Sequence, residues 1–193
     1  MPAAAFAAVF APAAIVAHEA GHFLCYVLFG FPGPQLHYGS AGWDGLREFN
    51  THMQAGNVAA AQALASIGLS GVAAGVGPLV TYMAIAAGLW LLHRYESIAG
   101  GALAVGASAR VVVLIPVLMG RSEGTDEARM ALAFSVPELP FHFLGLAGFV
   151  VAVGGSFVLL RRHGRPHLLT FTILGTALGV GVWMGGPGRV LLP

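Results

Sequence analysis

The sequence predicts an all-α, polytopic membrane protein with about five transmembrane helices and a short irregular or β-hairpin-like segment after the first. Of its 193 residues, 57% are hydrophobic and only 9% are charged, whereas about a quarter of the residues in a soluble domain are usually charged. The mean hydropathy is +0.80. The apolar residues also gather in stretches of the length that a helix needs to cross a bilayer, about 17–25 residues.

These stretches predict five spans. They are residues 3–29, 72–92, 98–119, 141–160 and 168–184. The first resembles the apolar part of a signal peptide, but no Lys or Arg precedes it and its apolar character continues past His22. We therefore expect an uncleaved helix.

The connection between the first two spans is the longest one with no helical periodicity. Residues 31–57 are rich in Gly and Pro and predict irregular or hairpin-like structure at one membrane face. Residues 58–70 are too few to span, and they predict an interfacial helix or an N-terminal extension of the second span. The net charge of +1 gives no electrostatic basis for binding nucleic acid.

The first span carries three ionisable groups in the stretch VAHEAGHFL, residues 16–24. His18 and His22 are four residues apart, so on a helix they lie on one face, one turn apart. Two imidazoles so placed can bind one zinc ion, and Glu19 can reach a zinc-bound water as the general base. Each ionisable group inside a bilayer costs up to about 3 kcal/mol, so the sequence favours a metal site over two structural histidines.

The motif HEAGH resembles the zinc-binding sequence of the site-2 protease family of intramembrane zinc metalloproteases, and the chain looks like a short, divergent member. Residues 73–92, AAGVGPLVTYMAIAAGLWLL, are similar to the second core helix of that family. Gly77 and Pro78 match its Gly-Pro, and Thr81 stands where the family has Asn. The resemblance implies that these three residues contact the substrate.

A catalytic zinc ion takes three protein ligands and one water, so a third ligand must come from elsewhere. The family uses an aspartate after its third core helix. Here the third span contains Pro116, without an Asn three residues earlier, and the sequence continues to Asp126. The resemblance therefore implies Asp126 as the ligand. Position alone leaves three alternatives that reach the same membrane face, namely Glu127, Glu138 and His142.

Arg110 is a further charged residue within a predicted span, and it needs a partner or a water-lined cavity. It predicts pairing with a carboxylate, such as that of Glu19 or Asp126, or a position at the interface.

The resemblance covers roughly residues 5–130, and residues 141–184 add further membrane helices. We expect one metalloprotease-like membrane domain over residues 1–193, in the inner membrane of a prokaryotic cell. The expected activity is zinc-dependent hydrolysis of peptide bonds in a membrane-anchored protein substrate, with residues 31–57 pairing with an extended strand of that substrate. The rival hypothesis is a non-proteolytic subunit on the same scaffold, with a structural metal or none, and with partners in a membrane complex.

Overall fold

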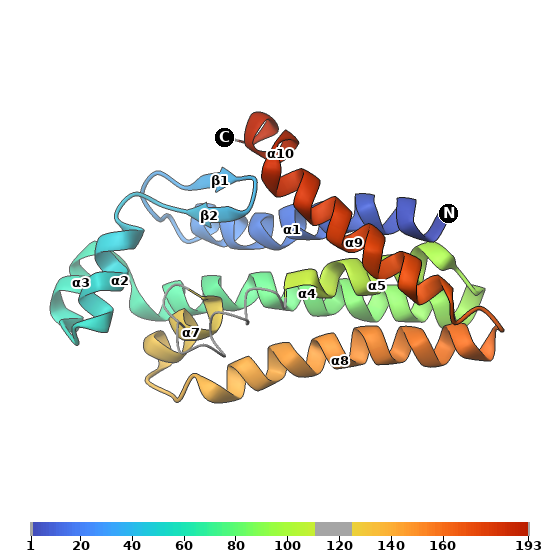
Figure 1. The fold of residues 1–193 in the computed structure, drawn as a ribbon. Helices are drawn as coiled ribbons and strands as arrows, with labels where there is room; N and C mark the ends of the chain where they lie inside the picture. Colours follow the sequence, from blue (N-terminus) through green and yellow to red (C-terminus); the bar gives the residue numbers. More distant parts are fainter. Residues whose placement is uncertain (1, 111–124, 193) are drawn as a thin grey trace.

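The computed structural model describes residues 2–110 and 125–192. Long helices run side by side through the molecule, and a small β-hairpin and short helices gather at one end (Figure 1). The long helices are α1 (Pro2–Leu28), α4 (Ile67–Tyr95), α8 (Leu139–Arg162) and α9 (Leu168–Gly185). By length and composition, all four could cross a membrane. The protein is therefore an all-α polytopic membrane protein, as predicted.

The outer surface of the bundle is apolar, as a lipid-facing surface must be. Leu79, Val150 and Leu178, on three different helices, are 54%, 58% and 63% exposed. A soluble protein rarely exposes so many large apolar side chains, whereas the acyl chains of a bilayer solvate them.

The predicted spans agree closely with the helices. Helices α1, α8 and α9 match their predictions to within two residues at each end. Helix α4 begins at Ile67, earlier than predicted, and therefore includes residues 67–70. The preceding residues form a separate short helix, α3 (Val58–Leu64). The predicted N-terminal extension is therefore confirmed for residues 67–70, and the interfacial position of the preceding helix stays a prediction.

The third predicted span is described only in its first half. Helix α5 (Ile98–Ser108) is apolar and packs between α1 and α4. Residues 111–119 of the predicted span, including Pro116, lie outside the described residues.

The segment after α1 contains the predicted hairpin. Strands β1 (Gln35–His37) and β2 (Ser40–Gly42) pair antiparallel, with Leu36 opposite Ala41. The sequence analysis did not predict the helix that follows, α2 (Leu46–Gln54). Its Phe49 side chain is buried against Trp43, so tertiary packing stabilises a helix too short to be stable alone.

The other short helices lie at the ends of the long ones. Helix α7 (Asp126–Phe134) packs on α4 and precedes α8, and α10 (Pro187–Leu191) follows α9. The hairpin turn is tied to this last segment, because the Tyr38 amide donates to the Leu192 carbonyl and the Trp183 indole donates to the Tyr38 carbonyl. The hairpin therefore has a fixed position over one end of the bundle (Figure 1).

Small residues let the helices approach closely. A Cβ atom at Gly175 or Gly179 of α9 would overlap the backbone of Ala4 or Ala8 of α1. The same holds between α4 and α5, where Gly88 lies against the carbonyl of Gly100. Inside a bilayer, where lipid is as apolar as the core, such close van der Waals contact is a main source of helix association.

We expect Gly179→Leu to lower the free energy of unfolding by about 1–3 kcal/mol, because a side chain there must push α9 away from α1. Unfolding of the protein in mild detergent by increasing sodium dodecyl sulfate measures this. Gly181→Leu is the matched control, since Gly181 is on the same helix with open space around its Cβ position. Equal stability of the two variants would contradict this packing.

Candidate metal centre

The histidines of HEAGH lie together at the inner face of α1. Their side chains point toward α4, and both residues are buried, with exposed fractions of 2% for His18 and 1% for His22. The Nε2 atoms of the two rings are 3.1 Å apart. The helical spacing read from the sequence therefore brings two potential ligand atoms to one point.

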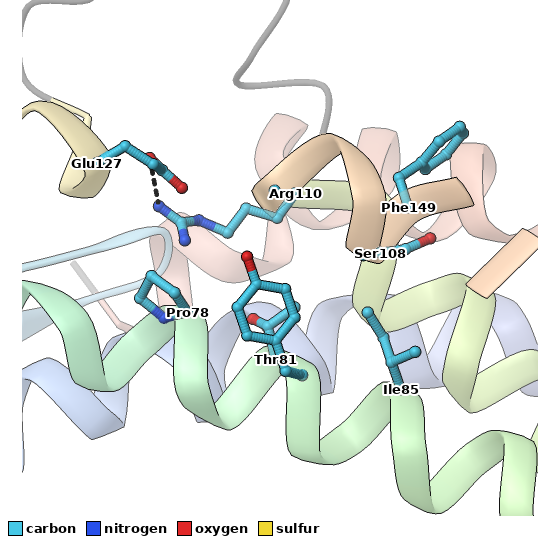
Figure 2. A pocket seen from close by; sticks show the side chains of 10 residues that line it. Pro78, Thr81, Ile85, Ser108, Arg110, Glu127 and Phe149 are labelled. Atoms are coloured by element: carbon cyan, nitrogen blue, oxygen red, sulfur yellow. Dashed lines mark ion pairs between the residues drawn. The ribbon is translucent and has the colours of Figure 1, made fainter. Parts of the chain in front are cut away.

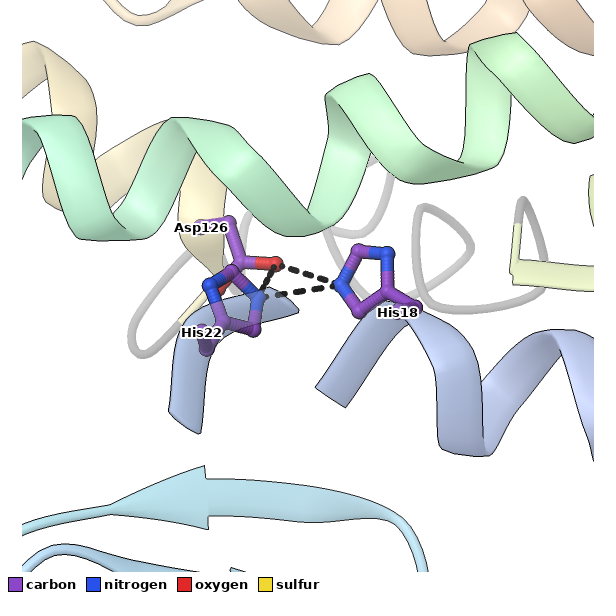
Figure 3. A group of neighbouring side chains, drawn as sticks. All are labelled: His18, His22 and Asp126. Carbon is purple, nitrogen blue, oxygen red and sulfur yellow. Dashed lines mark hydrogen bonds and ion pairs between the residues drawn. The ribbon is translucent and has the colours of Figure 1, made fainter. Parts of the chain in front are cut away.

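Asp126, 104 residues after His22 in the chain, completes the group (Figure 3). It is the first residue of α7. The Thr125 hydroxyl caps the N-terminus of this helix by accepting a hydrogen bond from the Ala128 amide. Its Oδ2 atom lies 3.1 Å from Nε2 of His18 and 3.1 Å from Nε2 of His22. Within residues 2–110 and 125–192, these three side chains form the group whose ligand atoms converge as a metal site requires.

The other nitrogen of each imidazole has its own partner. Nδ1 of His22 is 2.7 Å from the carbonyl oxygen of Ala73, and Nδ1 of His18 is 2.9 Å from the Thr81 hydroxyl. A carbonyl oxygen can only accept, so Nδ1 of His22 carries the hydrogen and Nε2 of the neutral ring presents a lone pair. Hydrogen bonds of this kind, made by the ring nitrogen that does not bind the metal, orient most metal-binding histidines.

The three converging atoms fit a metal ion. In the neutral ring, Nε2 of His22 faces a carboxylate oxygen and a second imidazole nitrogen at 3.1 Å, and acceptors at this distance repel each other unless a cation or a proton lies between them. Tetrahedral zinc with bonds of about 2.0–2.1 Å places its ligand atoms about 3.3 Å apart, close to the separations found here. Two imidazoles and one carboxylate are also a donor set that zinc accepts.

Two arginines divide the oxygens of Asp126 between them. Nη2 of Arg129, one helical turn along α7, lies 2.9 Å from Oδ1. The Arg110 guanidinium donates to Oδ2, the oxygen that also faces the histidines. Burial alone would raise the pKa of the Asp126 carboxyl, but Arg129 and Arg110 outweigh this effect and hold that pKa well below its usual range. The carboxylate is therefore ionised and ready to bind a cation.

Helix α4 supplies a close-fitting wall through Gly77. A Cβ atom on this residue would overlap Nε2 of both His18 and His22. Only glycine leaves the ligand atoms free, which is a structural reason for a glycine at this position. The resemblance implied substrate contact for Gly77, Pro78 and Thr81. The structure places Gly77 against the ligand atoms and Thr81 on His18, with Pro78 next to Gly77 in α4.

A cavity of about 320 Å³ opens beside His18, and Glu19 lines it as well. Its polar lining is His18, Glu19, Thr81 and Arg110. Its remaining walls are apolar or small side chains from α1, the end of α5, the hairpin turn and α9, namely Ala14, Ile15, Gly39, Ala107, Ala109, Val180 and Met184. The cavity has room for several atoms of a ligand, and a water molecule at its polar end would lie near both His18 and Glu19.

The alternatives for the third ligand lie elsewhere. Glu127 faces Arg110, with 3.8 Å between its Oε2 and Nη2 of the arginine (Figure 2). Glu138 and His142 face each other across one turn at the start of α8, at 3.8 Å. None of these three belongs to the convergent group found among the described residues.

Two features of the site were not predicted from the sequence. Arg129 was not singled out, although a position three residues after Asp126 has the spacing of an ion pair where the segment is helical. The hydrogen bond between His22 and the carbonyl of Ala73 has no sequence signal at all, because any residue supplies a backbone carbonyl.

The chain was compared with protein-family models, with curated proteins and with solved structures, and none of them matched.

We expect Gly77→Ala to weaken zinc binding by well over tenfold, because the added methyl group occupies the space of the two Nε2 atoms. Titration of the metal-free protein with zinc against a chelator measures the change. Gly68→Ala is the control on the same helix, since its Cβ position is open. Native affinity in Gly77→Ala would show that zinc does not bind between these histidines.

Proposed function

We propose that the protein is a zinc-dependent endopeptidase that cleaves membrane-anchored protein substrates within or near the bilayer. The observation that carries this proposal is the convergence of Nε2 of His18, Nε2 of His22 and Oδ2 of Asp126, each at 3.1 Å from the others, inside an apolar bundle. The likeness to the site-2 protease family seen in the sequence is part of the same proposal.

His18, His22 and Asp126 would hold the zinc ion. When bound, zinc lowers the pKa of a water molecule to about 7 and polarises a carbonyl oxygen. The protein contributes the orientation of its ligands: Ala73 and Thr81 fix the two rings through Nδ1. Arg129 holds Oδ1 of Asp126, which turns Oδ2 toward the histidines.

Glu19 would act as the general base. It follows His18 directly and lines the same cavity, so its carboxylate can accept a proton from a water at the histidine end and pass it to the leaving amine. Since the walls around it are mostly apolar, charges act more strongly in this cavity than in bulk solvent.

The hairpin is the proposed entry for substrate. Gly39 in its turn lines the cavity, and β1 and β2 are bonded only to each other among the described strands. Each therefore has one edge that could pair with an extended segment of a substrate. A substrate helix must unwind in this way before one of its carbonyl groups becomes accessible. We further propose a prokaryotic inner membrane as the location of this reaction.

A second candidate function is that of a non-proteolytic membrane subunit, with a structural metal or none, in a larger complex. One observation favours it: Arg110 already pairs with Oδ2 of Asp126, so the buried carboxylate is compensated without a metal.

The purified protein should contain about one zinc ion per chain, because a buried site with three protein ligands holds zinc tightly. Metal analysis after purification without chelators checks this. Asp126→Ala should lose most of the zinc, and Glu138→Ala should keep it, since Glu138 pairs with His142 at the start of α8. A zinc content well under half an ion per chain in the native protein would contradict the proposal of a resident zinc.

Glu19→Gln should abolish cleavage while zinc stays bound, because the glutamate handles a proton and is not a ligand. New protein N-termini in membranes that contain the native protein, relative to membranes that contain the variant, measure the activity. Glu48→Gln is the matched control, since Glu48 lies exposed on α2. If native and Glu19→Gln membranes show the same N-termini while both proteins hold zinc, the scaffold function is favoured.

A further inference from the structure

Oδ2 of Asp126 lies between two kinds of group, and a single oxygen atom cannot bind both of them closely. On one side are the Nε2 atoms of His18 and His22, each at 3.1 Å. On the other side is the guanidinium of Arg110, which donates to the same oxygen. A zinc ion held by the histidines and Oδ2 would lie beside this guanidinium, and two cations at such short range repel each other. Arg110 and the metal therefore compete for Asp126.

The second arginine takes no part in this competition. Arg129 contacts Oδ1, the oxygen turned away from the histidines, and its Nη1 atom also donates to the Tyr26 hydroxyl at 3.3 Å. It is held from two sides and can keep both contacts whether or not a metal is present.

Arg110 has an alternative partner next to Asp126 in the sequence. Oε2 of Glu127 is 3.8 Å from Nη2 of Arg110, beyond hydrogen-bonding distance but within reach of a small rotation (Figure 2). Glu127 is 6% exposed, and an unpaired carboxylate at this depth is costly. Both side chains line a cavity of about 30 Å³.

From these contacts we propose that Arg110 is an exchangeable counter-cation of the site. Without a metal it neutralises Asp126 through Oδ2. When zinc binds, the guanidinium leaves Oδ2 and pairs with Glu127. This proposal rests on the zinc site described above, and Arg110 acts in it as a positioning residue that sets how readily the ligand Asp126 becomes available.

The exchange has a physical advantage inside a membrane. A buried carboxylate without a partner destabilises a fold by several kcal/mol. Without a metal, Arg110 pairs closely with Oδ2 of Asp126 while it stays 3.8 Å from Glu127, and after the metal binds it can pair closely with Glu127. The folded bundle can therefore form first and bind zinc later.

Zinc affinity of the full-length protein in detergent, titrated with zinc against a chelator, tests the exchange. Arg110→Gln removes the competing charge and should bind zinc about tenfold more tightly than the native protein, because two cations at such short range repel each other. Arg129→Gln removes an equal charge from the other oxygen of Asp126 and should bind zinc more weakly, because Asp126 loses its orienting contact. Glu127→Gln should also bind more weakly, because Arg110 loses its second partner.

The pattern across these variants decides the matter. Equal or weaker zinc binding in Arg110→Gln overturns the exchange. If Arg110→Gln does not fold, Glu127→Gln decides alone, with weaker binding in support and native affinity against. If the native protein holds no zinc, the proposed protease function fails. In that case zinc binding by Arg110→Gln still supports the exchange, and its absence overturns that too.

Discussion

The buried carboxylate of Asp126 is the group on which the functional end of this molecule depends. It is 3% exposed at the edge of an apolar bundle, and an ionised carboxylate is stable there only with charges and hydrogen bonds around it. Arg129 and Arg110 supply the charges, and His18 and His22 lie against one of its oxygens. These contacts join α7 to α1 and to the end of α5. The interactions that stabilise the charge therefore also assemble the candidate site.

Close helix packing makes this assembly possible. The histidines of α1 reach α7 across the surface of α4, and they can do so because α4 has no side chain at Gly77. The same helix then fixes the rings, through the carbonyl of Ala73 and the hydroxyl of Thr81. Elsewhere, glycines at the α1–α9 and α4–α5 contacts hold the helices at backbone distance. The precision of the site is thus a consequence of small residues, not of large core side chains.

The two candidate functions differ in what compensates Asp126. In the protease proposal, zinc shares the carboxylate with the histidines, and Glu19 faces the adjoining cavity as a base. In the scaffold alternative, Arg110 is the permanent partner. An exchange of Arg110 between Asp126 and Glu127 would connect these two states in one protein, with the metal-free form as a stable folded intermediate.

The sequence by itself determined the membrane fold, four of the spanning helices, the hairpin and the pairing of His18 with His22. All of these depend on local rules: the length of apolar stretches, turn residues, and the fixed spacing of a helix. Position along the chain could not decide among Asp126, Glu127, Glu138 and His142, because Asp126, which completes the convergent group, is 104 residues from His22. Its position depends on how α7 docks on α4. That docking also decided the roles of Arg110 and Arg129, since partners from separate helices meet only when the packed backbones bring them together.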